Sequence, residues 1–120
     1  MNATKLNRLL KKSMISLWGG APILTQKWMA QAECSLDDAK YVSRSISNLI
    51  KQHQFDEKEY GKAETAIIKS AETTLSSGGA IFSAEWISDQ AYSYDQAHSA
   101  AKYIALAINT HHFNGEHSFA

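Results

Sequence analysis

Four side chains with the chemistry of a ligand site cluster near the start of the last third of the chain. They lie within thirteen residues of one another and are Trp86, Tyr92, Tyr94 and His98. Aromatic rings that carry a polar atom are common in small-molecule pockets and in interfaces, because one part packs while the other hydrogen-bonds. His98 could act as a general base if a carboxylate such as Asp95 or Glu85 oriented it. The sequence predicts a ligand-binding region here, with core packing of Trp86 and one tyrosine as the alternative.

The same region contains a near-duplication, in which SDQAYS is followed by YDQAHS over residues 88–99. On one continuous helix, residues six apart lie about 120° from each other, so the two copies would not share a face. Ser93 and Gln96 instead have the spacing of a capping box, in which each side chain bonds the other residue's backbone N–H. We interpret the duplication as a junction where one helix ends near Tyr92 and the next begins after Ser93.

The C-terminal tail holds residues of metal-ligand type: His111, His112, Glu116 and His117. Their spacing matches neither a His-Glu-x-x-His motif nor a Cys/His finger, and histidine is favoured at helix C-termini by the helix dipole. The chain also lacks a phosphate-binding glycine loop and a Gly-x-Ser-x-Gly motif. We therefore assign no metal site, no cofactor and no catalytic residue, and the sequence inclines against an enzyme.

The chain has one cysteine, Cys34, which excludes an internal disulfide and favours a reducing, cytoplasmic location. A thiol beside a helix N-terminus can have a depressed pKa. Because no histidine is near in the sequence, an unreactive buried thiol is the expectation. The apolar stretch after the basic N-terminus is shorter than the roughly 7–15 residues of a signal peptide, and no run approaches the ~20 residues of a membrane span.

Charge is balanced overall but unevenly distributed. The 12 basic and 12 acidic residues cancel, which gives no general attraction to nucleic acid. Residues 1–30 carry five cations and no acid, whereas residues 83–120 have an excess of three negative charges. This polarity could steer a partner or align two copies head to tail. The basic first helix could also contact nucleic acid or anionic lipid, although lysines on a surface helix are usually just solvated.

Apolar spacing predicts helices almost throughout, with breaks at the two Gly-Gly pairs and Pro22. The expected helices cover residues 3–18, 23–33, 35–53, 56–78 and 94–110. Residues 80–92 are ambiguous between a short strand and a short helix capped by Ser83. Ser35 with Asp38, and Asp56 with Glu59, have N-cap spacing. Gly61 lies where a helix interior is costly, so either another backbone approaches it or the helix begins one turn later.

These patterns predict an all-α protein of one domain, residues 1–120, in which five or six short helices surround a buried C-terminal helix. Alanines along 94–110 would let neighbouring helices approach closely. The expected function is a non-catalytic binding or interaction protein, homo-oligomeric through the alanine-rich helix or an exposed aromatic patch. The alternatives are a small-molecule binder or enzyme with an aromatic-lined pocket at Trp86, Tyr92, Tyr94 and His98, and a nucleic-acid or membrane contact through the first helix.

Overall fold

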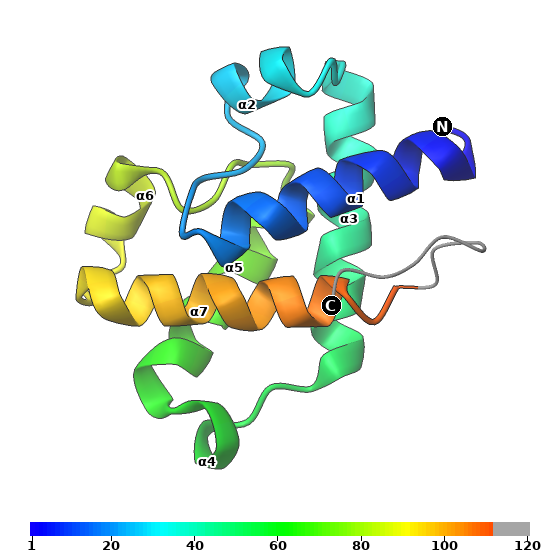
Figure 1. The fold of residues 1–120 in the computed structure, drawn as a ribbon. Coiled ribbons are helices and arrows are strands. Elements are labelled where there is room, and N and C mark those ends of the chain that lie inside the picture. Colours follow the sequence, from blue (N-terminus) through cyan, green and yellow to red (C-terminus); the bar gives the residue numbers. More distant parts are fainter. Residues whose placement is uncertain (112–120) are drawn as a thin grey trace.

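The computed structural model describes residues 1–111 and confirms an all-α fold (Figure 1). The helices are α1 (Ala3–Trp18), α2 (Gln26–Gln31), α3 (Leu36–His53), α4 (Glu57–Tyr60), α5 (Lys62–Ser76), α6 (Ala84–Asp89) and α7 (Tyr94–Ile108). Within residues 1–111, no helix is both long enough and apolar enough to cross a membrane.

Side-chain caps fix where the helices begin, as the sequence indicates. The Ser93 hydroxyl accepts from the backbone N–H of Gln96 at 3.1 Å, and the Gln96 side chain accepts from the N–H of Ser93 at 3.0 Å. This confirms that residues 88–99 hold a junction and that the second helix begins after Ser93, whereas the preceding helix ends at Asp89, earlier than the expected end near Tyr92. Ser35 and Asp38 form a second capping box at the start of α3.

Two expected helices have different bounds in the structure. The segment 56–78 contains two helices, because Gly61 has φ +95° and separates α4 from α5. Of the two alternatives for Gly61, the structure shows the second, in which the long helix begins about one turn later. The helix expected over 23–33 is wrong at its start: Leu24 has φ +65°, Thr25 caps the helix, and only Gln26–Gln31 is helical. In the ambiguous segment, Ser83 does cap a short helix, α6.

The chain contains two similar halves that meet at a short antiparallel bridge between Ile23 and Ile81. The two residues exchange backbone hydrogen bonds of 3.2 and 3.3 Å. Their sequence numbers differ by 58, and the same offset relates α1 to α5, α2 to α6 and α3 to α7. The bridge therefore lies where an approximate twofold axis would relate the halves.

Local geometry is repeated at this offset in detail. Trp28 in α2 donates its indole N–H to the Ser16 hydroxyl at 3.2 Å. Trp86 in α6 donates to the Thr74 hydroxyl at 3.1 Å. Left-handed backbone recurs as well, in pairs 58 positions apart: Gly20 and Gly78, Leu24 and Phe82, Glu33 and Ala91. The likeness thus includes unusual backbone conformations and side-chain bonds, which helix content alone does not produce.

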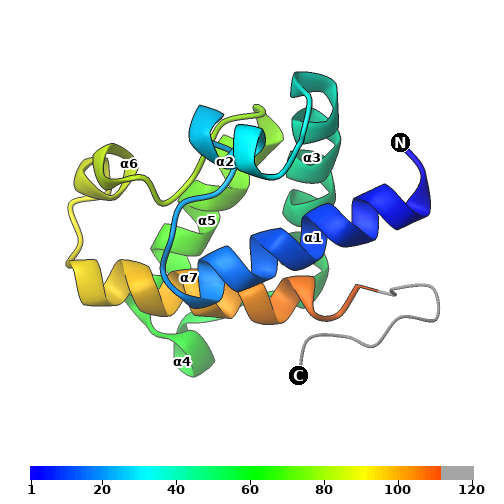
Figure 2. The same cartoon turned by 45° about the horizontal axis from the view of Figure 1, so that its top comes forward.

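The halves exchange partners when they pack. The first helix of each half lies along the last helix of the other, so α1 packs on α7 and α5 packs on α3 (Figures 1 and 2). Equivalent positions fill the core in both halves: Leu9 with Ile67, Leu10 with Ile68, Leu17 with Leu75, Ala39 with Ala97, Ile46 with Ile104, and Ile50 with Ile108. The core is therefore shared between the halves.

The C-terminal helix α7 is buried along one side by α1, α3 and α5. Its alanines are used inside the fold, since Ala97, Ala100, Ala101, Ala105 and Ala107 are all buried. The equivalent helix α3 is likewise packed by α5, α7 and α1. α7 and α3 therefore form an equivalent pair. Of the two oligomer contacts expected from the sequence, the alanine face of α7 is already occupied within the chain.

Candidate functional site

The structure separates the four side chains of the predicted ligand region into different environments. Trp86 is partly buried between α6 and α5, where its indole N–H bonds Thr74 and its ring lies 4.9 Å from the ring of Phe82. Tyr92 and Tyr94 are exposed on either side of the Ser93 cap. Trp86 thus has the core-packing role that the sequence offered as the alternative.

His98 lies on the first turns of α7 against the end of α1. A Cβ placed on Gly20 would lie 2.7 Å from the His98 ring, which shows that the ring packs on the glycine backbone. The His98 Nε2 atom is buried without a hydrogen-bond partner among residues 1–111. The cavities described below are lined by other residues, and ligand binding at Trp86, Tyr92, Tyr94 and His98 stays a prediction.

Exposed apolar side chains occur on both α1 and α7, two helices that lie side by side in Figures 1 and 2. Ile15 and Trp18 are 58% and 41% exposed on α1, and Leu106 is 44% exposed on α7. The Lys102 ammonium lies 5.5 Å from the centre of the Trp18 ring and joins the two helices across this surface. We call these four residues the α1/α7 face.

The α5/α3 pair carries polar residues at the corresponding positions. Thr73, Ser76 and Asn48 stand 58 positions from Ile15, Trp18 and Leu106, and all three are exposed. Because the α5/α3 pair achieves the same packing with these polar residues, the fold does not require apolar side chains here. An exposed apolar surface that folding does not require is a mark of an interaction site.

The surroundings of the α1/α7 face are hollowed and basic. A depression of about 200 Å³ opens beside Ile15 between α1 and α2, lined by Lys12, Ile15, Ser16, Trp28, Gln31 and Ala32. Residues 1–32 contain no acid, whereas the equivalent α5–α6 segment contains Glu64, Glu72, Glu85 and Asp89. The α1–α2 segment is therefore basic where the equivalent α5–α6 segment is acidic.

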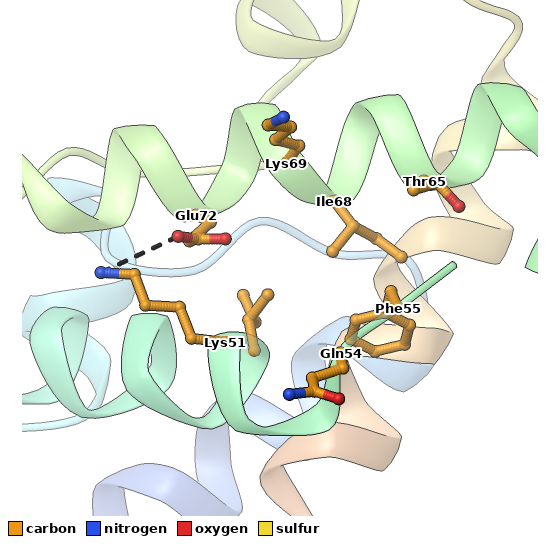
Figure 3. Close-up of a pocket in the computed structure, with 8 residues that line it drawn as sticks. Lys51, Gln54, Phe55, Thr65, Ile68, Lys69 and Glu72 are labelled. Atoms are coloured by element: carbon orange, nitrogen blue, oxygen red, sulfur yellow. Dashed lines mark ion pairs between the residues drawn. The ribbon is translucent and has the colours of Figure 1, made fainter. Parts of the chain in front are cut away.

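A larger cavity, of about 350 Å³, opens between α3 and α5 (Figure 3). We call it the α3/α5 cavity. Ile50, Phe55 and Ile68 supply its apolar lining, and Lys51, Gln54, Thr65, Lys69 and Glu72 supply its polar lining. Lys51 of α3 reaches across toward Glu72 of α5, with 3.8 Å between nitrogen and oxygen.

The α3/α5 cavity is associated with a change in one histidine contact between the halves. In the α1/α7 pair, Asn7 is buried and its Oδ1 lies 3.1 Å from Nε2 of His111, which follows α7. The equivalent residues are Thr65 and His53, but His53 Nε2 pairs instead with the Tyr60 hydroxyl at 2.8 Å. Burial raises the pKa of Tyr60, and the nearby charges of Glu59 and Asp56 add to that effect.

As a consequence, the Thr65 hydroxyl is buried without a partner among residues 1–111. The His53 ring stacks on Phe55 at 4.2 Å, which holds that aromatic side chain at the cavity wall. A buried unpaired hydroxyl costs about 1–3 kcal/mol. The cavity therefore contains a polar atom that a ligand could satisfy.

Cys34 lies in an environment that suppresses reactivity. Partial burial raises the pKa of its thiol, and the negative charge of Asp38 adds to that effect. We expect Cys34 to react with a disulfide reagent at pH 7.5 more slowly than free glutathione does, because less thiolate is present. The same reaction in denaturant should proceed at the rate of an ordinary thiol. Equal rates before and after unfolding would contradict this assignment.

No group of three or more His, Cys, Asp or Glu side chains suited to a metal ion occurs within residues 1–111. His112, Glu116 and His117 of the tail lie outside the described residues. Comparison of the chain with protein-family models, with curated proteins and with solved structures finds no match to any of them.

Proposed function

We propose that this protein is a non-catalytic interaction module that binds an acidic amphipathic segment of a partner on the α1/α7 face. One observation carries the proposal: Ile15, Trp18 and Leu106 are exposed and apolar where the α5/α3 pair has Thr73, Ser76 and Asn48. Tryptophan is enriched among residues that dominate binding energy, and Trp18 is 41% exposed on this surface.

Charge supports an acidic partner over a second copy of the same chain. The α1/α7 face is flanked by Lys12 and contains Lys102, and no acid lies in residues 1–32. Two copies that met through this face would bring like charges together, whereas acidic flanks on a partner would complement them. The depression beside Ile15 would accept one apolar anchor of the partner.

The proposal is tested with the variant Ile15→Thr/Trp18→Ser/Leu106→Asn, which copies the equivalent residues of the α5/α3 pair. We expect it to keep its free energy of unfolding within about 1 kcal/mol, because exposed substitutions cost little. We expect it to bind a labelled helical peptide with leucine anchors and glutamate flanks at least about tenfold more weakly than the unaltered protein. Fluorescence anisotropy measures the binding.

Three controls decide which occupant is right. A peptide with lysine in place of glutamate should not bind. The variant Thr73→Ala/Ser76→Ala/Asn48→Ala, which changes the equivalent positions of the α5/α3 pair, should bind the acidic peptide as the unaltered protein does. Light scattering that shows a dimer, lost in the first variant, would replace the partner with a second copy. Binding to anionic vesicles, lost in the same variant, would assign the face to a membrane surface.

A further inference from the structure

We propose that the α3/α5 cavity binds a small organic carboxylate with an apolar body. Its volume of about 350 Å³ lies within the range of small-ligand sites, about 300–1,000 Å³. This site shares no residue with the α1/α7 face, so the inference stands independently of the proposed function.

The apolar body of the ligand is matched by the cavity lining. Ile50 and Ile68 are buried residues of the two facing helices, and both line the cavity. In Figure 3, Ile68 points from α5 into the space between the helices, and the Phe55 ring lies at one end of it. A short alkyl or aryl group placed there would leave water for an apolar surface.

The charged end of the ligand is matched by two lysines and two neutral groups. Lys51 and Lys69 outweigh the single acid, Glu72, so the lining favours one negative charge. Lys51 is 58% exposed and its contact with Glu72 is 3.8 Å long, which makes that ion pair weak and easily exchanged for a ligand carboxylate. The Gln54 amide and the unpaired Thr65 hydroxyl can donate further hydrogen bonds.

The α1/α7 pair, which is equivalent to the α5/α3 pair, shows that these polar groups are not needed for folding. Asn109 and Met14 stand at the positions equivalent to Lys51 and Glu72, and Asn7 stands at the position of Thr65. There the buried amide is paired with His111, whereas the Thr65 hydroxyl has no partner within residues 1–111. The buried Oδ1 of Asn109 also has no partner within residues 1–111, so an unpaired polar atom occurs in both places. The feature that distinguishes the α3/α5 cavity from its counterpart is the charged pair Lys51 and Glu72.

Nitrogen–proton correlation NMR with hexanoate as the probe tests the site directly. We expect saturable shifts confined to the end of α3 and the start of α5, with a Kd on the order of 1 mM, as suits so small a ligand. Hexanol, which lacks the charge, should bind at least about tenfold more weakly, since charge-assisted hydrogen bonds are lost. The inference is overturned by equal binding of hexanol and hexanoate, or by no saturable shift up to about 50 mM, far above that Kd.

Substitutions in the lining give opposite expected effects. Glu72→Gln should tighten hexanoate binding about two- to fivefold, because it frees Lys51 and removes a repulsive charge. Lys51→Gln/Lys69→Gln should weaken binding about tenfold. If Glu72→Gln weakened binding instead, and norleucine bound more tightly than hexanoate, the ligand would be a zwitterionic amino acid whose ammonium group pairs with Glu72, and the assignment of a ligand with a net negative charge would be wrong.

Thr65→Asn copies the first half and should abolish hexanoate shifts by occupying the cavity, with the fold retained. Lys11→Gln, at the position equivalent to Lys69, is the matched control and should bind hexanoate as the unaltered protein does. The variant Ile15→Thr/Trp18→Ser/Leu106→Asn should also retain hexanoate binding, which separates a failure of this inference from a failure of the proposed function. Loss of hexanoate shifts in either control would show that the shifts do not report on the α3/α5 cavity.

Discussion

Gly20→Ala is expected to lower the free energy of unfolding by about 2–5 kcal/mol, measured by urea denaturation. Two effects add. Gly20 has φ +76°, a conformation that costs an L-residue about 1–2 kcal/mol. The new methyl group would also lie 2.7 Å from the ring of His98, and overpacking of this kind costs about 1–3 kcal/mol.

The second half of the molecule supplies a matched control for this prediction. Gly78 has φ +80°, but the nearest atom to its added Cβ would be Cγ of Lys40 at 3.8 Å, an ordinary contact. Gly78→Ala should therefore lose only the backbone part, about 1–2 kcal/mol. In a protein that already carries His98→Ala, the substitution Gly20→Ala should lower the free energy of unfolding about as much as Gly78→Ala does in the unaltered protein. If the two single variants lose equal stability, the His98 ring does not pack on Gly20 as described.

Ile104→Ala is expected to lower the free energy of unfolding by about 2–5 kcal/mol, the range for large-to-small changes in a core. Ile104 is 0% exposed on the inner side of α7, where α1, α3 and α5 meet that helix. Removal of its three outer carbons would leave a cavity that the surrounding helices cannot readily close. Calorimetry or urea denaturation measures the loss.

Two neighbours of this position test what the loss means. Leu106→Ala lies on the outer side of the same helix, is 44% exposed in the unaltered protein, and should change stability by less than about 0.5 kcal/mol. Ile46→Ala, at the equivalent position of α3, should cost about as much as Ile104→Ala, because Ile46 is also 0% exposed. A much smaller cost at Ile46 would show that α7 is the dominant core helix and that the pair is not equivalent.

The duplication gives this protein an internal comparison that separates folding requirements from other requirements. Positions that match between the halves, such as Ile23 with Ile81, are explained by packing. Positions that differ while remaining exposed or unpaired, such as Trp18 against Ser76 or Thr65 against Asn7, are not explained by it. Both proposals rest on this second group.

The sequence predicted the helices well where caps and glycines are local signals. Ser35, Ser93 and Asp56 cap their helices as expected, because the bonds lie within four residues. The duplication was also readable, since two Gly-Gly pairs, two tryptophans and two Ser caps recur at nearly constant spacing. The near-duplication at residues 88–99 does not indicate it, because the two copies in that short segment lie six residues apart, whereas the halves lie 58 residues apart.

The α3/α5 cavity could not be predicted in the same way. The residues that line it come from the end of α3 and from α5, which are separate segments of the chain. Its unpaired hydroxyl, on Thr65, arises because His53 hydrogen-bonds Tyr60 instead of Thr65. Each of these residues is unremarkable in its own segment. The α1/α7 face could not be predicted for a similar reason. Ile15 is of a residue type usually found in cores, and only its position on the outer side of α1 leaves it exposed.

The amino-acid sequence by itself determined the helical class, the places where helices begin, and the apolar stripes that must be buried. These properties depend on hydrogen bonds and periodicities that span a few residues. Tertiary structure decided that each half packs on the other, through the Ile23–Ile81 bridge and the α1/α7 and α3/α5 pairs. It thereby decided which apolar side chains stay in water and which polar atoms lack partners, because those outcomes depend on contacts between segments far apart in the chain.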